Sequence, residues 1–222
     1  MNKKIDWKKN VILFLTSQTI SLFGSSLVQY AIMWYITLNT KSGIMLTISI
    51  ICGVLPTFFL SPFAGVWADR YNRKMLIVLS DSMIAFVTLL LAILFFMGYD
   101  AMWLLFFASA VRALGGSIQT PAVNAFIPQF VPEDTLLRVN AVNGTVQSFT
   151  MVASPMLSGV LLTFSSIEVI FLIDVVTAAL AIFILFFFVD VPAHEKAQSI
   201  QTTGYFDDLK EGVRYIKDHK FI

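Results

Sequence analysis

The segment that decides the fold is residues 65–74, which reads GVWADRYNRK. It joins two long apolar stretches and places an acidic residue, Asp69, next to three cations: Arg70, Arg73 and Lys74. Cations in a short loop between membrane spans are expected on the cytoplasmic side. That preference explains neither the acid nor the small residue Gly65 four positions earlier. We therefore expect this charge cluster to act as a latch between two helix bundles.

The composition places the stretches on either side of this segment in a membrane. Apolar residues make up 57% of the 222 residues, charged residues only 13%, and the mean hydropathy is +0.79. A soluble domain has roughly 25% charged residues, because polar groups must cover its surface. The chain is therefore an integral membrane protein, which excludes soluble enzymes, and its net charge of +1 offers no basic surface to nucleic acid.

Six apolar segments are long enough for a helix that crosses a membrane, which needs about 20 residues. They are residues 11–40, 42–68, 75–99, 101–131, 139–167 and 169–189. We expect an all-α bundle over 11–190, a cytoplasmic N-terminus at 1–10, and a cytoplasmic linker at 191–222. In the linker, apolar residues recur at helical spacing from Phe206 to Ile216, which predicts either an amphipathic helix on the membrane surface or a solvated linker helix.

The Lys and Arg residues indicate the orientation, because cytoplasmic loops are enriched in them. All but two fall on one side of the membrane when the six segments alternate. The two exceptions are Lys41, in the first loop, and Arg112, inside the fourth segment. This predicts that both termini are cytoplasmic. The chain ends at Phe221 and Ile222, which look like the approach to another apolar segment, so it can stop short of a second half.

The clearest candidate for function is Arg112. A charged residue near the bilayer centre costs at least about 2.5–3.5 kcal/mol, so it needs a partner or a wet cavity. Gly116 and Gln119 lie on the same helical face. The arginine either has a functional role or only braces neighbouring helices. Asp81 and Asp174 leave the same alternatives open, since each can take up a proton, pair with a cation, or accept hydrogen bonds between packed helices.

Polar residues form stripes on two of the segments. In the first, four residues fall within about 80° on a helical wheel and are expected to line a cavity: Gln18, Ser21, Ser25 and Gln29. In the fifth, a similar stripe lies beside Pro155 and Gly159 and either lines a water-filled path or packs against another helix. Its members are Asn140, Asn143, Gln147, Ser154 and Ser158.

The sequence predicts no cofactor, metal site or catalytic residue. The one cysteine, Cys52, lies inside an apolar segment, and the two histidines, His194 and His219, lie outside all of them. A phosphate-binding loop of the Gly-x4-Gly-Lys-Ser/Thr type does not occur.

At residues 65–74 the chain resembles the major facilitator superfamily, whose signature in loose form reads Gly-x-x-x-Asp-Arg-x-Gly followed by Arg-Lys. The matching residues are Gly65, Asp69, Arg70, Arg73 and Lys74. Asn72 replaces the usual glycine, and asparagine enters the left-handed region more readily than most residues. Arg112 and Gly116 match a second motif of the family, whose arginine is implicated in proton coupling. A fifth-span motif of drug antiporters is only partly present, at Pro155 and Gly159.

Three segments also look like the macrolide-efflux branch of drug–proton antiporters: WADR at 67–70, TPAVN at 120–124 and FLIDV at 171–175. The resemblance implies the amino-terminal half of a fold with two six-helix halves around a cavity, each half built from two inverted three-helix repeats. The first and fourth helices would line the cavity.

This resemblance implies a secondary transporter in the cytoplasmic membrane that exports drugs or other small amphipathic molecules by alternating access, coupled to protons. Its partners would be substrate, protons, membrane lipid and a second six-helix half. Many relatives have a carboxylate in the first span, which this chain lacks, so the proton would bind Asp81, Asp174 or the other half. The alternatives are a six-helix interaction module without transport activity, and an exporter of a siderophore or metabolite.

Overall fold

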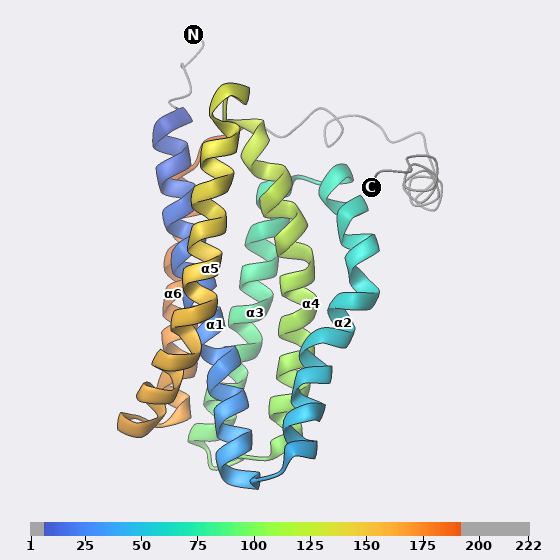
Figure 1. The fold of residues 1–222 in the computed structure, drawn as a ribbon, viewed down its shortest axis with the longest axis vertical. Helices are drawn as coiled ribbons and strands as arrows, with labels where there is room; N and C mark the ends of the chain where they lie inside the picture. Colours follow the sequence, from blue (N-terminus) through green and yellow to red (C-terminus); the bar gives the residue numbers. More distant parts are fainter. Residues whose placement is uncertain (1–6, 192–222) are drawn as a thin grey trace.

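The computed structural model describes residues 7–191, which form a bundle of long helices joined by short turns (Figure 1). The helices are α1 (Trp7–Thr40), α2 (Gly43–Arg70), α3 (Arg73–Phe96), α4 (Met102–Phe126), α5 (Glu133–Phe164) and α6 (Ile167–Phe188), with a short 3-10 helix, η1 (Ile127–Gln129), after α4. All six α-helices are long and apolar enough to cross a membrane, which confirms the predicted fold class. The amphipathic helix predicted around 206–216 lies outside the described residues.

The polar ends of the helices extend beyond the predicted apolar segments. α1 begins at Trp7 and α5 at Glu133, where the prediction began at 11 and 139. The first turn of α5 carries two acids, which suit the positive end of a helix dipole. Asn72 does not take the left-handed conformation that its place in the motif suggested. It has φ −62° and ψ 112°, and its side chain caps α3 by accepting a hydrogen bond from the Met75 amide.

The helices of the bundle pack against one another in the order α2, α4, α3, α6, α1, α5. α1 packs against α6 and α5, α4 packs against α2 and α3, and α3 packs against α6. The helices α2 and α5 therefore lie at the flanks, as Figure 1 shows most clearly for α2. Both expose large apolar side chains along their lengths, among them Phe58, Phe59, Phe149 and Met156.

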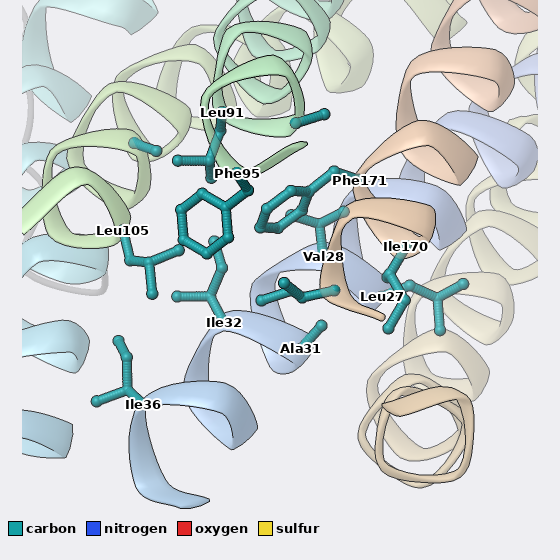
Figure 2. Packing of buried hydrophobic residues seen from close by; sticks show 13 residues of the cluster. Leu27, Val28, Ala31, Ile32, Ile36, Leu91, Phe95, Leu105, Ile170 and Phe171 are labelled. Atoms are coloured by element: carbon teal, nitrogen blue, oxygen red, sulfur yellow. The ribbon is translucent and has the colours of Figure 1, made fainter. Parts of the chain in front are cut away.

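Two apolar clusters fill the interior at different heights. One surrounds Phe95 and Phe171, whose rings meet edge to face at 5.6 Å between centroids (Figure 2). The other surrounds Phe14 and Phe126, near the end of the bundle where α6 finishes. On α1, α3 and α4 the buried residues between the two clusters are largely polar, and on α6 Asp174 lies at this level, followed by Ala178 and Ala181. A buried polar layer therefore crosses the bundle between two dry regions.

Candidate functional site

Arg112 on α4 is the centre of the buried polar layer, and its side chain is only 4% exposed. Its Nη1 donates to Asp174 Oδ2 on α6 at 2.6 Å and to the hydroxyl of Thr88 on α3. Its Nη2 donates to the main-chain carbonyl of Ser25 on α1 at 2.9 Å and to the Ser25 hydroxyl at 3.2 Å. One guanidinium group thus joins four helices, using the planar fork of donors that distinguishes arginine from lysine.

Thr88 was not identified from the sequence, although a signal was present. It lies seven residues after Asp81, which places the two side chains on the same face of α3. Its hydroxyl oxygen is 3.1 Å from Asp174 Oδ2, so it contacts both members of the ion pair. A polar residue two helical turns from a buried acid is therefore a candidate site residue that helical spacing alone indicates.

Asp81 on α3 is the second buried acid, and it is 2% exposed. The Ser21 hydroxyl on α1 donates to its Oδ1 at 2.7 Å, and Gln119 Nε2 on α4 donates to the same oxygen at 2.6 Å. Its Oδ2 has no hydrogen-bond partner in the described part of the chain. The two buried acids therefore differ, because Asp174 pairs with a cation while Asp81 is held by neutral donors.

The four polar residues of the stripe on α1 do not share one environment. Ser21 and Ser25 contact the buried charged groups, whereas Gln18 lines an open pocket. Gln29 faces α2, where its amide lies against Gly53. The stripe is directed into the bundle as well as toward a cavity, because Ser21 meets α3, Ser25 meets α4 and Gln29 meets α2.

The pocket has a volume of about 640 Å³ and lies between α1, α4 and α5. Its polar lining includes Gln18, Tyr30, Gln119, Asn124, Asn143 and Gln147, together with serine and threonine hydroxyls. A volume of this size falls within the range of roughly 300–1,000 Å³ found for small-molecule sites. The pocket therefore has room for a drug-sized molecule and offers it amide and phenol groups. Within residues 7–191, no group of three or more His, Cys, Asp and Glu side chains could hold a metal ion.

The stripe on α5 divides between lining and packing. Asn143 and Gln147 line the pocket, while Ser158 is fully buried and donates to the Leu27 carbonyl of α1 at 2.6 Å. Farther along the same interface, Trp34 Nε1 of α1 donates to the Pro155 carbonyl at 3.1 Å. Gly159 lies beside the same indole ring. Pro155 and Gly159 thus belong to the packing of α5 on α1.

The cations of the loop at 65–74 contact the ends of helices in their own bundle. Arg73 donates to the Ala68 carbonyl at 2.9 Å and to the Ala125 carbonyl at 2.8 Å. Lys74 Nζ donates to the carbonyls of Phe186 and Val189 at 3.0 and 2.7 Å. These carbonyls lie at or near the carboxyl ends of α2, α4 and α6, where backbone acceptors lack helical partners and cations are favoured.

Asp69 lies at the same end of the bundle and is mostly exposed, with its side chain 61% accessible. It forms an ion pair with Arg73 at 3.6 Å. Gly65, four residues earlier on α2, faces open space, since a Cβ atom there would meet nothing within 4 Å. The predicted latch between two bundles remains a prediction, but the contacts of Arg73 and Lys74 link the helices of a single bundle.

Comparison with known proteins places the chain among transporters. Residues 14–221 match the family described as the Major Facilitator Superfamily. The chain is 29% identical to Macrolide efflux protein A of Streptococcus pyogenes, over 99% of this chain and 54% of that protein. It is 22% identical to the Staphyloferrin A transporter of Staphylococcus aureus, over 93% of this chain and 51% of that protein. It is 27% identical to a Na(+), Li(+), K(+)/H(+) antiporter of Planococcus maritimus, over 66% of this chain and 34% of that protein. The chain thus spans about half the length of the first two relatives.

Proposed function

Since the chain belongs to the Major Facilitator Superfamily, we propose that it forms the amino-terminal half of a secondary transporter that exports amphipathic small molecules in exchange for protons. The observation that carries this proposal is the polar pocket between α1, α4 and α5, which adjoins a buried layer of charge. A pocket without ionisable neighbours would support binding alone. A pocket whose wall contacts the buried acid Asp81, through Gln119, also supports coupling to protons.

Each part of the structure then has a role in alternating access. The pocket binds the substrate, and the clamp of Arg112 on Asp174, Thr88 and Ser25 holds the helices that must move together. The loop at 65–74 reinforces the end of the bundle, with Asp69 and Arg70 facing a second six-helix half. That half would cover the open side of the pocket and the exposed apolar faces of α2 and α5.

The substrate class follows from the lining of the pocket and from the relatives. Amides and a tyrosine suit a molecule that is largely apolar but carries several hydrogen-bonding groups. Macrolide efflux protein A makes a macrolide the first substrate to test. A siderophore or other metabolite is the second candidate, because a relative covering nearly as much of the chain is a Staphyloferrin A transporter.

The proposed location is the cytoplasmic membrane, with both termini in the cytoplasm. In the described part of the chain, the two ends of the bundle differ in their lysines and arginines. One end carries Lys8, Lys9, Arg70, Arg73, Lys74 and Arg138, whereas Lys41 is the single described cation at the opposite end. This asymmetry is the one that the preference for positive cytoplasmic loops predicts.

The test is drug efflux by the complete transporter in a bacterial strain that lacks its own exporters. Expression should lower the accumulation of erythromycin, and collapse of the proton gradient should restore it. Arg112→Lys keeps the positive charge but loses the planar guanidinium group that donates to Asp174 and Ser25 at once. Efflux should therefore fall while the amount of protein in the membrane stays the same. If erythromycin accumulation is unchanged and a panel of siderophores is exported instead, the second substrate class is correct.

A further inference from the structure

Gln119 connects the pocket to the buried acid Asp81. Its Nε2 donates to Asp81 Oδ1 at 2.6 Å, and the same side chain is part of the wall of the pocket. No other described residue has both properties: Ser21, the other donor to Asp81, does not line the pocket. A change in the charge of Asp81 can therefore reach a bound molecule directly through one side chain.

The chemistry of an amide allows this connection to switch. A glutamine side chain has a donor end, NH₂, and an acceptor end, C=O, while an ionised carboxylate only accepts hydrogen bonds. Next to ionised Asp81, Gln119 must present its NH₂ group to the acid, which leaves its oxygen free to accept a hydrogen bond from the pocket side. This is the arrangement found in the structure, where Nε2 faces the carboxylate.

Protonation of Asp81 at Oδ1, the oxygen that Gln119 contacts, reverses this preference. The acid then carries an O–H group that can donate, and the amide oxygen of Gln119 is its natural acceptor. A half-turn of the terminal amide, a torsion that is broad and roughly two-fold, places the oxygen toward Asp81 and the NH₂ group toward the pocket. The pocket then presents a donor where it had presented an acceptor.

We propose that Gln119 is an amide switch through which the protonation state of Asp81 determines whether the pocket accepts a hydrogen-bond donor such as the ammonium group of a drug. This proposal rests on the proposed function of drug–proton exchange. A cationic drug binds when Asp81 is ionised, because the pocket then presents the amide oxygen of Gln119. When the drug reaches the protonated state, it rotates the amide so that the oxygen faces the pocket again, and Asp81 releases its proton to water in the pocket. Substrate and proton then compete, as antiport requires.

Within residues 7–191, no charged neighbour of Asp81 forms a second link between this acid and the pocket. Arg112, on α4, binds Asp174 on α6 and Ser25 on α1. The titratable residue Tyr30 of α1 is part of the pocket wall. The other charged residues of the helices around Asp81 lie at helix ends: Lys8 and Lys9 on α1, Asp69 and Arg70 on α2, Arg73 and Lys74 on α3, and Glu168 on α6. Among the described residues, Asp81 is thus the buried acid whose charge no cation balances.

The first measurement needs no drug. Infrared difference spectra of the purified complete transporter in lipid nanodiscs are recorded between high and low pH. The switch predicts that a protonated-carboxyl band of Asp81 appears together with a change in the side-chain amide bands of Gln119. Asp81→Asn should remove both changes, and Gln119→Met should remove the amide change while the carboxyl band remains. A carboxyl band without any amide change that depends on Gln119 would overturn the switch.

The second measurement counts protons released on binding of erythromycin, whose amine is protonated at neutral pH, in weakly buffered solution with an indicator dye. The wild type should release protons, whereas Gln119→Met should release at least fivefold fewer protons per erythromycin bound. Gln29→Met, which removes an amide that lies against α2 and outside the pocket, is the matched control and should keep the wild-type ratio. Equal release by wild type and Gln119→Met, or undiminished release by Asp81→Asn, would overturn the proposal.

The two measurements separate this proposal from the proposed function. If the amide and carboxyl bands change together but erythromycin neither binds nor is exported, the switch stands and the substrate assignment fails. If erythromycin is exported but the bands of Gln119 do not follow Asp81, transport stands and the switch fails. Proton release that depends on added sodium instead of pH would assign the site to a metal cation and overturn it.

Discussion

The ion pair between Arg112 and Asp174 gives the sharpest prediction of stability. The side chains are 4% and 1% exposed, and Asp174→Asn removes the charge that balances the guanidinium group at 2.6 Å. Removal of one partner from a buried pair destabilises a protein by about 3–5 kcal/mol, because the other charge stays buried without compensation. With roughly 2–4 °C per kcal/mol for a chain of this length, Tm should fall by about 6–20 °C.

The matched control removes both charges together. In the double variant Arg112→Met with Asp174→Leu, side chains of similar volume replace the pair, and such replacements are often neutral or stabilising. The assay is thermal unfolding of the purified transporter in one detergent, followed by tryptophan fluorescence. It compares wild type, Asp174→Asn, Arg112→Met, Asp174→Leu and the double variant. Recovery of most of the lost Tm in the double variant is expected. A single variant within about 1 °C of wild type would refute the role of the pair as a structural clamp.

Three further predictions follow from contacts elsewhere. Gly24→Ala should lower Tm by several degrees, because the new Cβ would lie 2.0 Å from Thr177 Oγ1 and 3.3 Å from the Asp174 main chain. The control Gly116→Ala should be neutral or slightly stabilising, because a Cβ there would meet nothing within 4 Å. Lys74→Met should lower the free energy of unfolding in chemical denaturant by about 1–2 kcal/mol, because it leaves the carbonyls at the end of α6 without their charged donor. Replacement of the exposed Lys41 by Met is the control and should leave that free energy unchanged. In a Cys52→Ser background, Lys41→Cys should react with an impermeant thiol reagent added outside intact cells and Arg138→Cys should not; the reverse pattern would invert the proposed topology.

The sequence predicted the helices well because the bilayer imposes a simple rule on composition. Any segment of about 20 apolar residues must become a helix there, so counting apolar runs located all six. The ends were less accurate, because a helix continues into water as long as its backbone groups are satisfied. α5 thus extends six residues beyond the predicted segment to Glu133.

The charged residues of the buried polar layer could be predicted from the sequence, but the contacts between them could not. A single charge in an apolar segment identified Arg112, Asp81 and Asp174, because each such charge needs a reason. The sequence did not reveal that Arg112 binds Asp174 and leaves Asp81 to neutral donors, since that choice depends on how α3 and α6 rotate about their axes. Helical spacing gives the face of one helix, but it does not state which other helix that face meets.

The unsatisfied atoms of the polar layer bear on whether it is a rigid brace or a moving part. Fully satisfied buried networks rigidify a protein, yet in the described residues Asp81 Oδ2, Asp174 Oδ1, Arg112 Nε and Gln18 Nε2 all lack a hydrogen-bond partner. Orphaned buried atoms cost free energy in this arrangement, and a second arrangement that satisfies them lies correspondingly closer in energy. The two apolar clusters above and below are built from buried side chains without hydrogen-bonding groups. We therefore expect the helices of this bundle to change their relative positions at the polar layer.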